Sequence, residues 1–379
     1  MRNPAAVEIT GPEPTVFSNA AGVYQDGVLA FDRDPAGLLW AVVGHENLGG
    51  MSVWAGPQIS SAERLHYSRF SFDTGTAGPA FGGSRYPDGP RARGLLWPCG
   101  LYIDPSSGTF HLFVHNETAW GAGETAYTAR EVGVEGEPDF RHIGKLTSHD
   151  QGRTWDFDGW IITSSLPSWT VHCRPDGLPG GQSGSVVSLG AGDFSVFASP
   201  HDDYLYIFYT QIFHRLDEGE LIDRIYVARS PKRSCGAPGT WKKYFEQDFV
   251  TDGNGGPETQ ILTTANVPCV TWNTHLGCYL MTSYNRPAWT EGSGTLQFAC
   301  SDDLVTWTSP VLVCPGRQEL SLPYFTQMGA DGAVGVTGRE FLILAESNGT
   351  DVLQFSVCLP QDCEEASGVQ ADRAAHHRR

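Results

Sequence analysis

The stretch that decides the fold is Asp104-Pro-Ser-Ser-Gly-Thr-Phe-His-Leu-Phe-Val-His-Asn-Glu117. An Asp-Pro turn and a glycine lead into a run of β-forming residues, 109–114, and this run ends on His115, Asn116 and Glu117. A Gly- or Asp-bearing turn between two short β-forming runs predicts a β-hairpin.

The same order of turn, β-forming run and polar end recurs along the chain. Residues 34–46 and 276–286 repeat it closely, and residues 202–211 and 337–346 repeat it more loosely. Hairpins that recur at spacings of roughly 50 to 100 residues are typical of propeller blades, in which each blade is one small antiparallel sheet. We therefore predict an all-β chain folded as a five-bladed β-propeller, with an irregular outer half in the first blade.

The repeats also predict how the chain is divided. Residues 19–360 would form the propeller. The Pro-rich segment 1–18 contains one short apolar run, Ala6–Ile9, which would pair with the last blade and close the ring. Residues 361–379 are polar and are predicted to be a disordered tail.

A second motif supports the blades. Ser148-His-Asp150-Gln-Gly152-Arg-Thr154-Trp155 matches the Asp-box pattern Ser-x-Asp-x-Gly-x-Thr-Trp, and residues 301–307 and 229–241 carry weaker versions. In such a turn the Asp accepts hydrogen bonds from backbone amides, the Gly takes a positive φ, and the Trp packs between blades. The motif indicates a structural turn on the outer rim and not an active site.

Charge and cysteine content limit the partners and the compartment. The formal net charge of −18 comes from 25 Lys and Arg against 43 Asp and Glu, so we expect neither nucleic acid nor an anionic membrane as a partner. No run reaches the ~18 apolar residues of a membrane span, and the first ten residues lack the pattern of a secretory signal. The nine cysteines contain no Cys-x-x-Cys pair, which favours reduced thiols and a cytoplasmic protein. Nothing in the sequence indicates an oligomeric state.

Two further segments of the sequence resemble those of a known protein family. Asp203-Tyr-Leu-Tyr-Ile-Phe-Tyr209 and Val270-Thr-Trp-Asn-Thr-His-Leu-Gly-Cys-Tyr279, together with the blade count, resemble the five-bladed glycoside hydrolases: arabinanases, xylosidases, invertases and levansucrases. The resemblance covers about residues 20–358. It implies a site in the funnel on the ring axis, with an Asp from blade 1, a second Asp from blade 2 and an acid Glu from blade 3. Asp26 matches the first position, Cys99 stands where the second Asp would be, and Asp193 stands where the Glu would be.

The hairpin alignment indicates the mouth of this funnel without the family. In a four-stranded blade, the start of the first strand and the end of the second strand open on the same face. The first strands would start at Asp26, Cys99, Asp193, Cys269 and Tyr324, and the second strands would end on polar residues that include Glu346. We predict Asp26, Glu117 and Asp193 as catalytic carboxylates. Substrate-binding residues are predicted at His45, Glu46, His115, Asn116, Trp120, Gln211, His214, Asn285 and Arg286.

Three hypotheses for the function follow from this ring of polar residues. The first is a glycosidase that uses paired carboxylates as acid and base or nucleophile on a small carbohydrate or glycoside. The second is a metal site built from His45, His115 and His214; no short-range ligand spacing supports it, so neither a metal nor a cofactor is expected. The third is a propeller that binds a carbohydrate or another small molecule without hydrolysing it, or is recruited to other small-molecule chemistry. The presence of Cys99 in blade 2 favours this third hypothesis.

Overall fold

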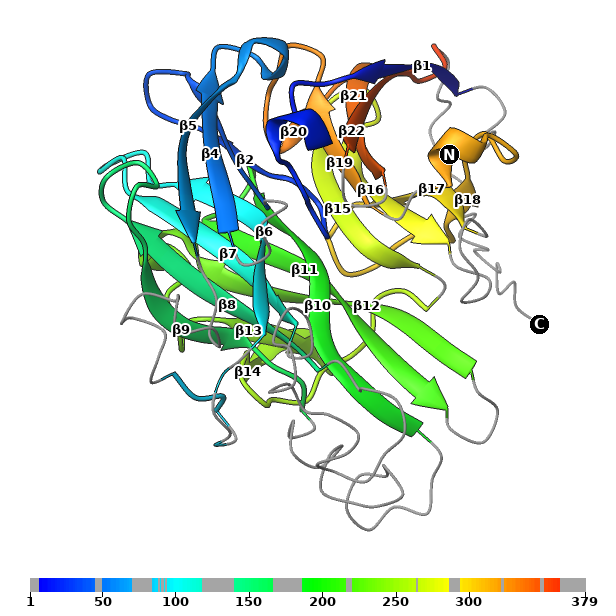
Figure 1. Ribbon diagram of the computed structural model, residues 1–379. Helices are drawn as coiled ribbons and strands as arrows, with labels where there is room; N and C mark the ends of the chain where they lie inside the picture. The colour runs from blue at the N-terminus through cyan, green and yellow to red at the C-terminus, as the bar shows by residue number, and fades with distance from the viewer. Residues whose placement is uncertain are drawn as a thin grey trace, which may run out of the picture.

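The computed structural model describes residues 7–44, 50–69, 84–87, 89, 92, 94–117, 140–165, 186–215, 220–263, 265–285, 294–321, 324–347 and 351–361. These residues form small antiparallel sheets (Figure 1). Turns and short 3₁₀ helices connect the strands, the helices being Asn19–Ala21, Ile59–Ser61, Lys232–Ser234 and Gln318–Leu320. None of the helices in this part of the chain is long and apolar enough to cross a membrane. The prediction of an all-β chain is therefore confirmed.

The first three groups of strands follow one another along the chain, and each runs back and forth in sequence order. The first contains β2 (Ala30–Arg33), β3 (Leu39–Gly44), β4 (Gly50–Gly56) and β5 (Glu63–Arg69). The second contains β6 (Leu95–Ile103), β7 (Phe110–Glu117), β8 (Arg141–Ser148) and β9 (Asp156–Ile162). The third contains β10 (Val186–Ala198), β11 (Tyr204–Arg215), β12 (Glu220–Pro231), β13 (Lys242–Phe245) and β14 (Asp248–Asp252). A single parallel pairing of Gly190 with Arg141 joins the second group to the third.

Two further groups complete the described strands. The fourth contains β15 (Asn266–Asn273), β16 (Cys278–Asn285), β17 (Thr295–Ser301) and β18 (Val311–Leu312), with β20 (Val336–Thr337) in parallel beside β15. The fifth contains β19 (Phe325–Gly329), β21 (Glu340–Ser347) and β22 (Asp351–Cys358), and its outer strand is β1 (Glu8–Pro14). We refer to these groups below as sheets 1 to 5.

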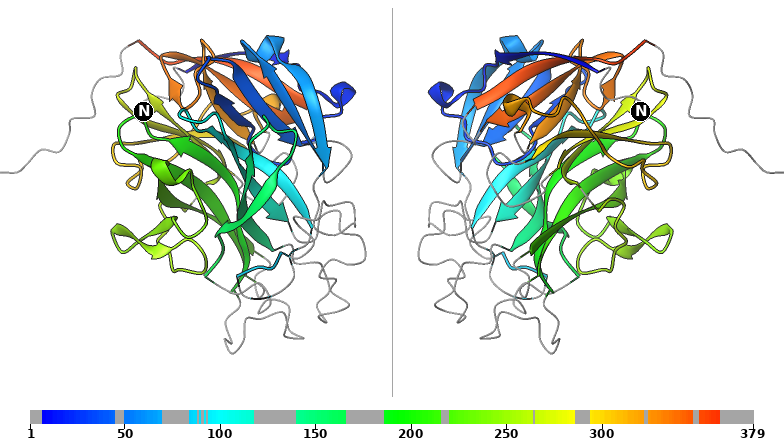
Figure 2. Two further views of the ribbon diagram at one scale, coloured as in Figure 1. Left: turned by 90° about the vertical axis from the view of Figure 1, so that its left-hand side faces the viewer. Right: turned by 90° about the vertical axis from the view of Figure 1, so that its right-hand side faces the viewer.

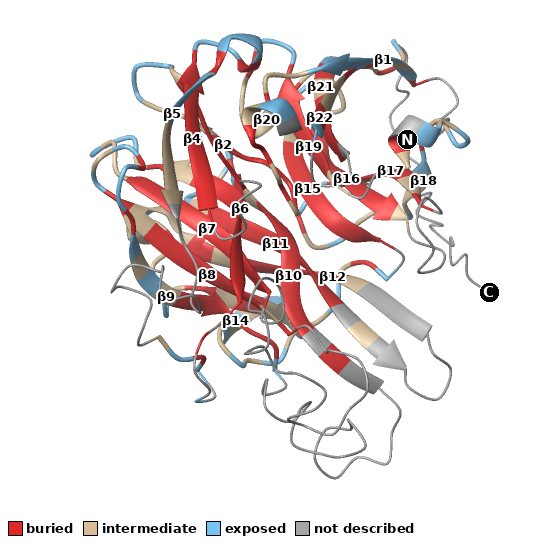
Figure 3. Ribbon diagram, in the orientation of Figure 1, coloured by how far each residue is buried: buried red, intermediate tan, exposed pale blue. Residues whose placement is uncertain are grey.

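Buried apolar side chains pack between successive sheets. One cluster joins Trp40 of sheet 1 to Leu112 of sheet 2, and others join sheet 2 to sheet 3, sheet 3 to sheet 4, and sheet 4 to sheet 5 in the same way. A further cluster joins Leu344 of β21 to Val43 of β3, so that sheet 5 packs against sheet 1. The inner strands are consequently covered on both faces, and β7 is buried along its whole length (Figure 3).

The N-terminal strand pairs with the last sheet, in antiparallel register from Glu8 opposite Cys358 to Pro14 opposite Leu353. The two ends of the described chain therefore lie in one sheet, as the three views agree (Figures 1 and 2). The predicted strand at residues 6–9 overlaps β1 only at Glu8 and Ile9. The strand continues through a Gly and a Pro, where the pairing with β22 is irregular; an edge strand tolerates these residues because one side of it carries no ladder bonds.

Two features of the strands differ from the sequence prediction. The outer half of the first sheet consists of two paired strands, since β4 and β5 pair from Gly50 opposite Arg69 to Ala55 opposite Glu63, with one register shift between Val53 and Trp54. Glycines at both ends of β4 obscure the β-forming pattern Met-Ser-Val-Trp-Ala between them. The second difference is that β7 does not end at Val114 but continues to Glu117, because its ladders to β6 and β8 extend that far. His115, Asn116 and Glu117 are buried members of the strand.

The turn between β8 and β9 has the hydrogen bonds that its sequence predicts. Asp150 accepts hydrogen bonds from the backbone N–H groups of Arg153 and Thr154 and from the Thr154 hydroxyl. Gly152 has a φ of 81°, and Trp155 is buried in the cluster between sheets 1 and 2. Although burial alone would raise it, the hydrogen bonds from Thr154 and its neighbours lower the pKa of Asp150 to about 2.

We expect Asp150→Ala to lower the free energy of unfolding by about 1–3 kcal/mol, because the turn amides lose their acceptor. Since the folded-state pKa lies below the ordinary value, this stability is present above about pH 4 and is lost as the pH falls towards 2. Urea unfolding of both proteins at neutral pH and in acid measures it, with the exposed Asp156→Ala as the matched control. Equal stability of Asp150→Ala and wild type at neutral pH would show that the turn does not need this carboxylate.

Removal of β1 should expose the full edge of β22. We expect deletion of residues 1–14 to lower the melting temperature and to promote aggregation, because an unpaired strand edge is a template for pairing with other chains. Deletion of residues 1–6, which leaves β1 intact, is the control. Thermal unfolding followed by light scattering distinguishes the two, and identical behaviour of the two deletions would contradict a stabilising role for β1.

Candidate active site

Glu117 and Asp193 lie on adjacent sheets and are bridged by one arginine. Glu117 is the last residue of β7, and its register partner on β8 is Arg141. The Nη2 atom of Arg141 lies 3.3 Å from Oε1 of Glu117, and its Nη1 atom donates a hydrogen bond of 3.2 Å to Oδ2 of Asp193. The Arg141 side chain is 15% exposed and both carboxylates are almost fully buried. The planar guanidinium has donors in a fixed fork, so it holds the two carboxylates in a defined relation.

The second oxygen of Glu117 is held by a tryptophan. The indole N–H of Trp97, on β6, donates a hydrogen bond of 2.8 Å to Oε2 of Glu117. Trp97 is buried and is the register partner of His115 on β7. The ring of Tyr24 packs on it, with ring centroids 5.8 Å apart. Glu117 is therefore fixed by an ion pair at one oxygen and by a hydrogen bond at the other.

A β-bulge sets the direction of Asp193. The register of β10 and β11 shifts between Gly192 and Phe194, which leaves Asp193 as the extra residue, with a φ of 43°. Asp tolerates this left-handed conformation better than most residues, and a bulge re-aims a side chain relative to its strand. The backbone N–H of Asp193 donates to Nδ1 of His115 at 3.4 Å. A Cβ atom at Gly192 would lie 2.4 Å from Nε2 of the same histidine, so the close contact with His115 requires glycine there.

The same irregularity recurs in the inner strands of two other sheets. β6 is bulged at Cys99, between Pro98 and Gly100, and β15 is bulged between Asn266 and Cys269. Cys99 therefore occupies in sheet 2 the position that Asp193 occupies in sheet 3. In sheet 4 the equivalent position falls before Cys269, so the sequence alignment of Cys269 with Asp193 is wrong. The hydrophobic pattern placed this position wrongly because a bulge adds one residue to a strand without changing the pattern.

Asp26 reaches the site from sheet 1. It lies before β2, and its Oδ1 atom accepts a hydrogen bond from the hydroxyl of Tyr324, which lies directly before β19 in sheet 5. Gly27 has a φ of 141°, and a Cβ atom there would lie 2.6 Å from the sulfur of Cys99. The backbone next to Asp26 therefore packs closely against β6, the strand that also contains Trp97.

Electrostatic effects link Asp26 to the pair on sheets 2 and 3. Burial raises the pKa of the Cys99 thiol, and the charges of Asp193, Asp26 and Glu117 raise it further. Burial also raises the pKa of Tyr324, again with contributions from Asp26, Asp193 and Glu117. The charges of all three carboxylates therefore act on the same two side chains, Cys99 and Tyr324.

Glu346 is a fourth carboxyl group in this region. It lies near the end of β21, its side chain is buried, and its backbone N–H donates a hydrogen bond of 3.2 Å to the carbonyl oxygen of Tyr324. Burial raises the pKa of Glu346 well above its usual range, and the negative charge of Asp26 raises it further.

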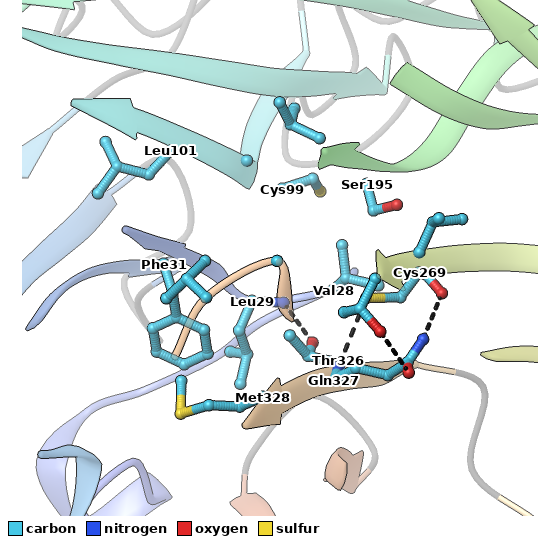
Figure 4. Close-up of a pocket in the computed structure, with 16 residues that line it drawn as sticks. Val28, Leu29, Phe31, Cys99, Leu101, Ser195, Cys269, Thr326, Gln327 and Met328 are labelled. Atoms are coloured by element: carbon cyan, nitrogen blue, oxygen red, sulfur yellow. Dashed lines mark hydrogen bonds between the residues drawn. The ribbon is translucent and has the colours of Figure 1, made fainter. Parts of the chain in front are cut away.

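A cavity continues along the inner strands beside this group. Figure 4 shows that the first strands of all the sheets, or the residues just before them, contribute to its wall. Val28, Cys99, Ser195, Cys269 and Thr326 each represent one sheet. The cavity wall is formed by apolar, thiol and neutral polar side chains. Cys99 belongs to this lining and also lies within the electrostatic reach of the three carboxylates.

Two of the predicted binding residues have their polar groups engaged within the fold. Asn116 is buried, donates to the carbonyl of Leu95 at 2.9 Å and accepts from the hydroxyl of Tyr86 at 2.8 Å. It lies on the opposite face of β7 from His115 and Glu117, because side chains alternate along a strand. Gln211 is also buried and donates to Glu258, which forms a 2.9 Å ion pair with Lys243. The amide groups of Asn116 and Gln211 are therefore hydrogen-bonded to other groups of the protein.

The other predicted substrate-binding residues lie partly inside and partly outside the described part of the structure. Asn285 is the half-buried last residue of β16. His214 lies in β11, but its side chain is outside the described part of the structure. Four further predicted residues lie wholly outside the described residues: His45, Glu46, Trp120 and Arg286. Among the described side chains, no group of three or more His, Cys, Asp or Glu residues could hold a metal ion.

Sequence reasoning missed Arg141 and Trp97, which hold Glu117. The signal that could have found Arg141 is its place as the first residue of the strand after Glu117, because a hairpin register then puts the two side by side. Trp97 directly precedes the Pro98 and Cys99 of the bulge, and a tryptophan in an inner strand is typical of the core.

Comparisons with known proteins identify the fold. Neither a protein-family model nor a curated protein sequence matches the chain. The chain is similar to the α-L-arabinofuranosidase from Lactobacillus brevis, with 11% identity over 90% of this chain and 92% of that chain and a TM-score of 0.50. It is also similar to Zg3597, a family 117 glycoside hydrolase from the marine bacterium Zobellia galactanivorans, with 10% identity over 95% and 92% of the two chains and a TM-score of 0.50. The resemblance stated from the sequence is thereby confirmed at the level of fold: the chain shares its architecture with the propeller glycoside hydrolases.

Proposed function

We propose that sheets 1 to 5 are the blades of one five-bladed propeller, with β1 joining the ends of the chain. Two observations support this arrangement. The apolar clusters connect each sheet to the next and connect sheet 5 to sheet 1. The cavity of Figure 4 is lined by residues of every sheet, as a channel on a propeller axis would be.

We propose further that the protein is a glycoside hydrolase acting on a small carbohydrate or glycoside at the axial end of the five sheets. The observation that carries the proposal is the set of contacts that holds three carboxylates: Arg141 bridges Glu117 and Asp193, and Tyr324 donates a hydrogen bond to Asp26. The charges of all three act on Cys99 and Tyr324. Hydrolysis of a glycosidic bond needs carboxyl groups on both sides of the sugar ring and passes through a transition state with positive charge on the ring.

The three carboxylates have different surroundings and therefore suit different tasks. Asp26 is held by a neutral hydroxyl, so it can act as base or nucleophile. Glu117 and Asp193 share Arg141, and a guanidinium favours the charged form of a carboxyl beside it. Fixed negative charges in a buried setting stabilise positive charge that develops on a bound sugar.

One observation favours a second candidate, a propeller that binds a carbohydrate without hydrolysing it. Cys99 holds the bulge position of sheet 2, where the resemblance implies a carboxylate, and the raised pKa keeps this thiol protonated. A thiol at that point supplies neither a charge nor a base. Assays with chromogenic furanosides and pyranosides decide between the two, since release of the chromophore by the wild-type protein requires hydrolysis.

We expect Glu117→Gln to lower kcat by ~10²-fold or more on a chromogenic glycoside that the wild type hydrolyses. Arg141 keeps Asp193 as its ion-pair partner in this variant, so the fold should be preserved, which thermal unfolding checks. The exposed Asp302→Asn is the matched control and should keep the wild-type rate. A Glu117→Gln variant with wild-type turnover would remove Glu117 from the mechanism and leave Asp26 and Asp193 as the carboxylates to test.

A further inference from the structure

The proposed hydrolase needs a group that delivers a proton to the departing oxygen of the substrate. Glu117 and Asp193 are less suited to this task, because the guanidinium of Arg141 beside them favours the ionised form of both. Asp26 accepts a hydrogen bond from Tyr324, which also favours its ionised form. A general acid must instead hold its proton until the transition state.

Glu346 is placed on the side of sheet 5 that faces Asp26. It shares a face of β21 with Leu344, because side chains two residues apart in a strand point the same way. Leu344 belongs to the apolar cluster between sheets 5 and 1, together with Val43 and Leu29 of sheet 1. Glu346 therefore lies on the face of β21 that packs against sheet 1, near the segment before β2 that contains Tyr24 and Asp26.

The environment of the Glu346 carboxyl favours its neutral form. The side chain is only about 2% exposed, and no described residue hydrogen-bonds to its Oε1 atom. Two effects raise its pKa well above the usual range, first the burial and then the charge of Asp26. Among the described residues, Tyr24, Tyr324 and Cys99 interact electrostatically with the pair, and their pKa values are raised by burial and by nearby carboxylates, which favours their neutral forms.

We propose that Glu346 is the proton donor of the hydrolytic reaction and that Asp26 is the ionised carboxylate paired with it. This inference rests on the proposed glycosidase function. Two neighbouring carboxyls of which only one is ionised supply an acid and a base at the same pH.

Protons and electron pairs balance over the proposed reaction. As the glycosidic C–O bond breaks, its electron pair goes to the leaving oxygen, which takes the proton of Glu346. In a single displacement, water attacks the anomeric carbon and gives a proton to Asp26. In a double displacement, Asp26 first bonds to that carbon, and a water that gives its proton to the Glu346 carboxylate then replaces it. One water is consumed in either case. The double displacement ends with Glu346 protonated and Asp26 ionised, as at the start, whereas after the single displacement proton exchange with solvent restores this state.

Leaving-group dependence tests the proton donor. A dinitrophenyl glycoside has a leaving group that needs no proton, whereas an alkyl glycoside of the same sugar does. We expect Glu346→Gln to lower kcat by ~10²-fold or more on the alkyl glycoside and to leave the dinitrophenyl rate within a few-fold of wild type. Asp26→Asn should lower both rates. Glu340→Gln, at the exposed start of the same strand, is the matched control and should change neither. Equal losses on both substrates in Glu346→Gln would overturn the inference.

A titration that needs no substrate separates this inference from the proposed function. Carboxyl ¹³C NMR of glutamate-labelled protein, with Glu346→Gln to assign the resonance, should show Glu346 titrating far above the ordinary value of about 4.3. Asp26→Asn should lower that value, because the charge that opposes ionisation is removed. An ordinary pKa for Glu346 overturns the proton-donor assignment even if the enzyme is active. A wild type that hydrolyses no glycoside overturns the hydrolase proposal, while the titration still decides whether Glu346 and Asp26 form the pair.

Discussion

The ion pair of Arg141 with Glu117 and Asp193 is the interaction on which the candidate site depends. It connects β8 to the end of β7 and to the bulge of β10, so it fixes sheet 2 against sheet 3 at the point where each carries a buried carboxylate. Buried carboxylates without a partner would be costly, and removing one member of a buried ion pair is more damaging than never having had it. Arg141 thus makes it possible for two acidic side chains to stay charged inside the molecule.

The remainder of the site is arranged around this anchor by backbone geometry. Bulges in β6 and β10 make Cys99 and Asp193 the equivalent extra residues of neighbouring inner strands. The Gly27 contact with Cys99 and the Gly192 contact with His115 allow backbone to approach side chains more closely than any other residue would permit. These close approaches bring segments from separate sheets together, which is what a site on the axis of a ring of sheets requires.

The division of the carboxyl groups into two environments gives the site its chemical character. One pair shares an arginine. In the other pair, Asp26 accepts a hydrogen bond from Tyr324, and Glu346 is a buried carboxyl whose pKa is raised by burial and by the charge of Asp26. A shared guanidinium favours the charged form of both members of the first pair, whereas burial and the charge of Asp26 raise the pKa of Glu346 in the second. The same residue types therefore have opposite tendencies to ionise according to what lies beside them.

The sequence by itself determined the all-β class, the order of the hairpins and the turn at Asp150, because these depend on local patterns of turn residues and β-forming runs. It also indicated Asp26, Glu117, Asp193, Tyr324 and Glu346, because each follows or precedes a β-forming run. The predicted place of Asp193 at the start of its strand was wrong, since Asp193 lies at a bulge inside β10. The sequence could not show that Asn116 faces away from Glu117 into the fold, or that β7 remains paired to its last residue. Only the tertiary structure decided that Arg141 joins two carboxylates and that Glu346 faces Asp26, because these contacts join sheets far apart in the chain and depend on bulges that add one residue without changing the hydrophobic pattern.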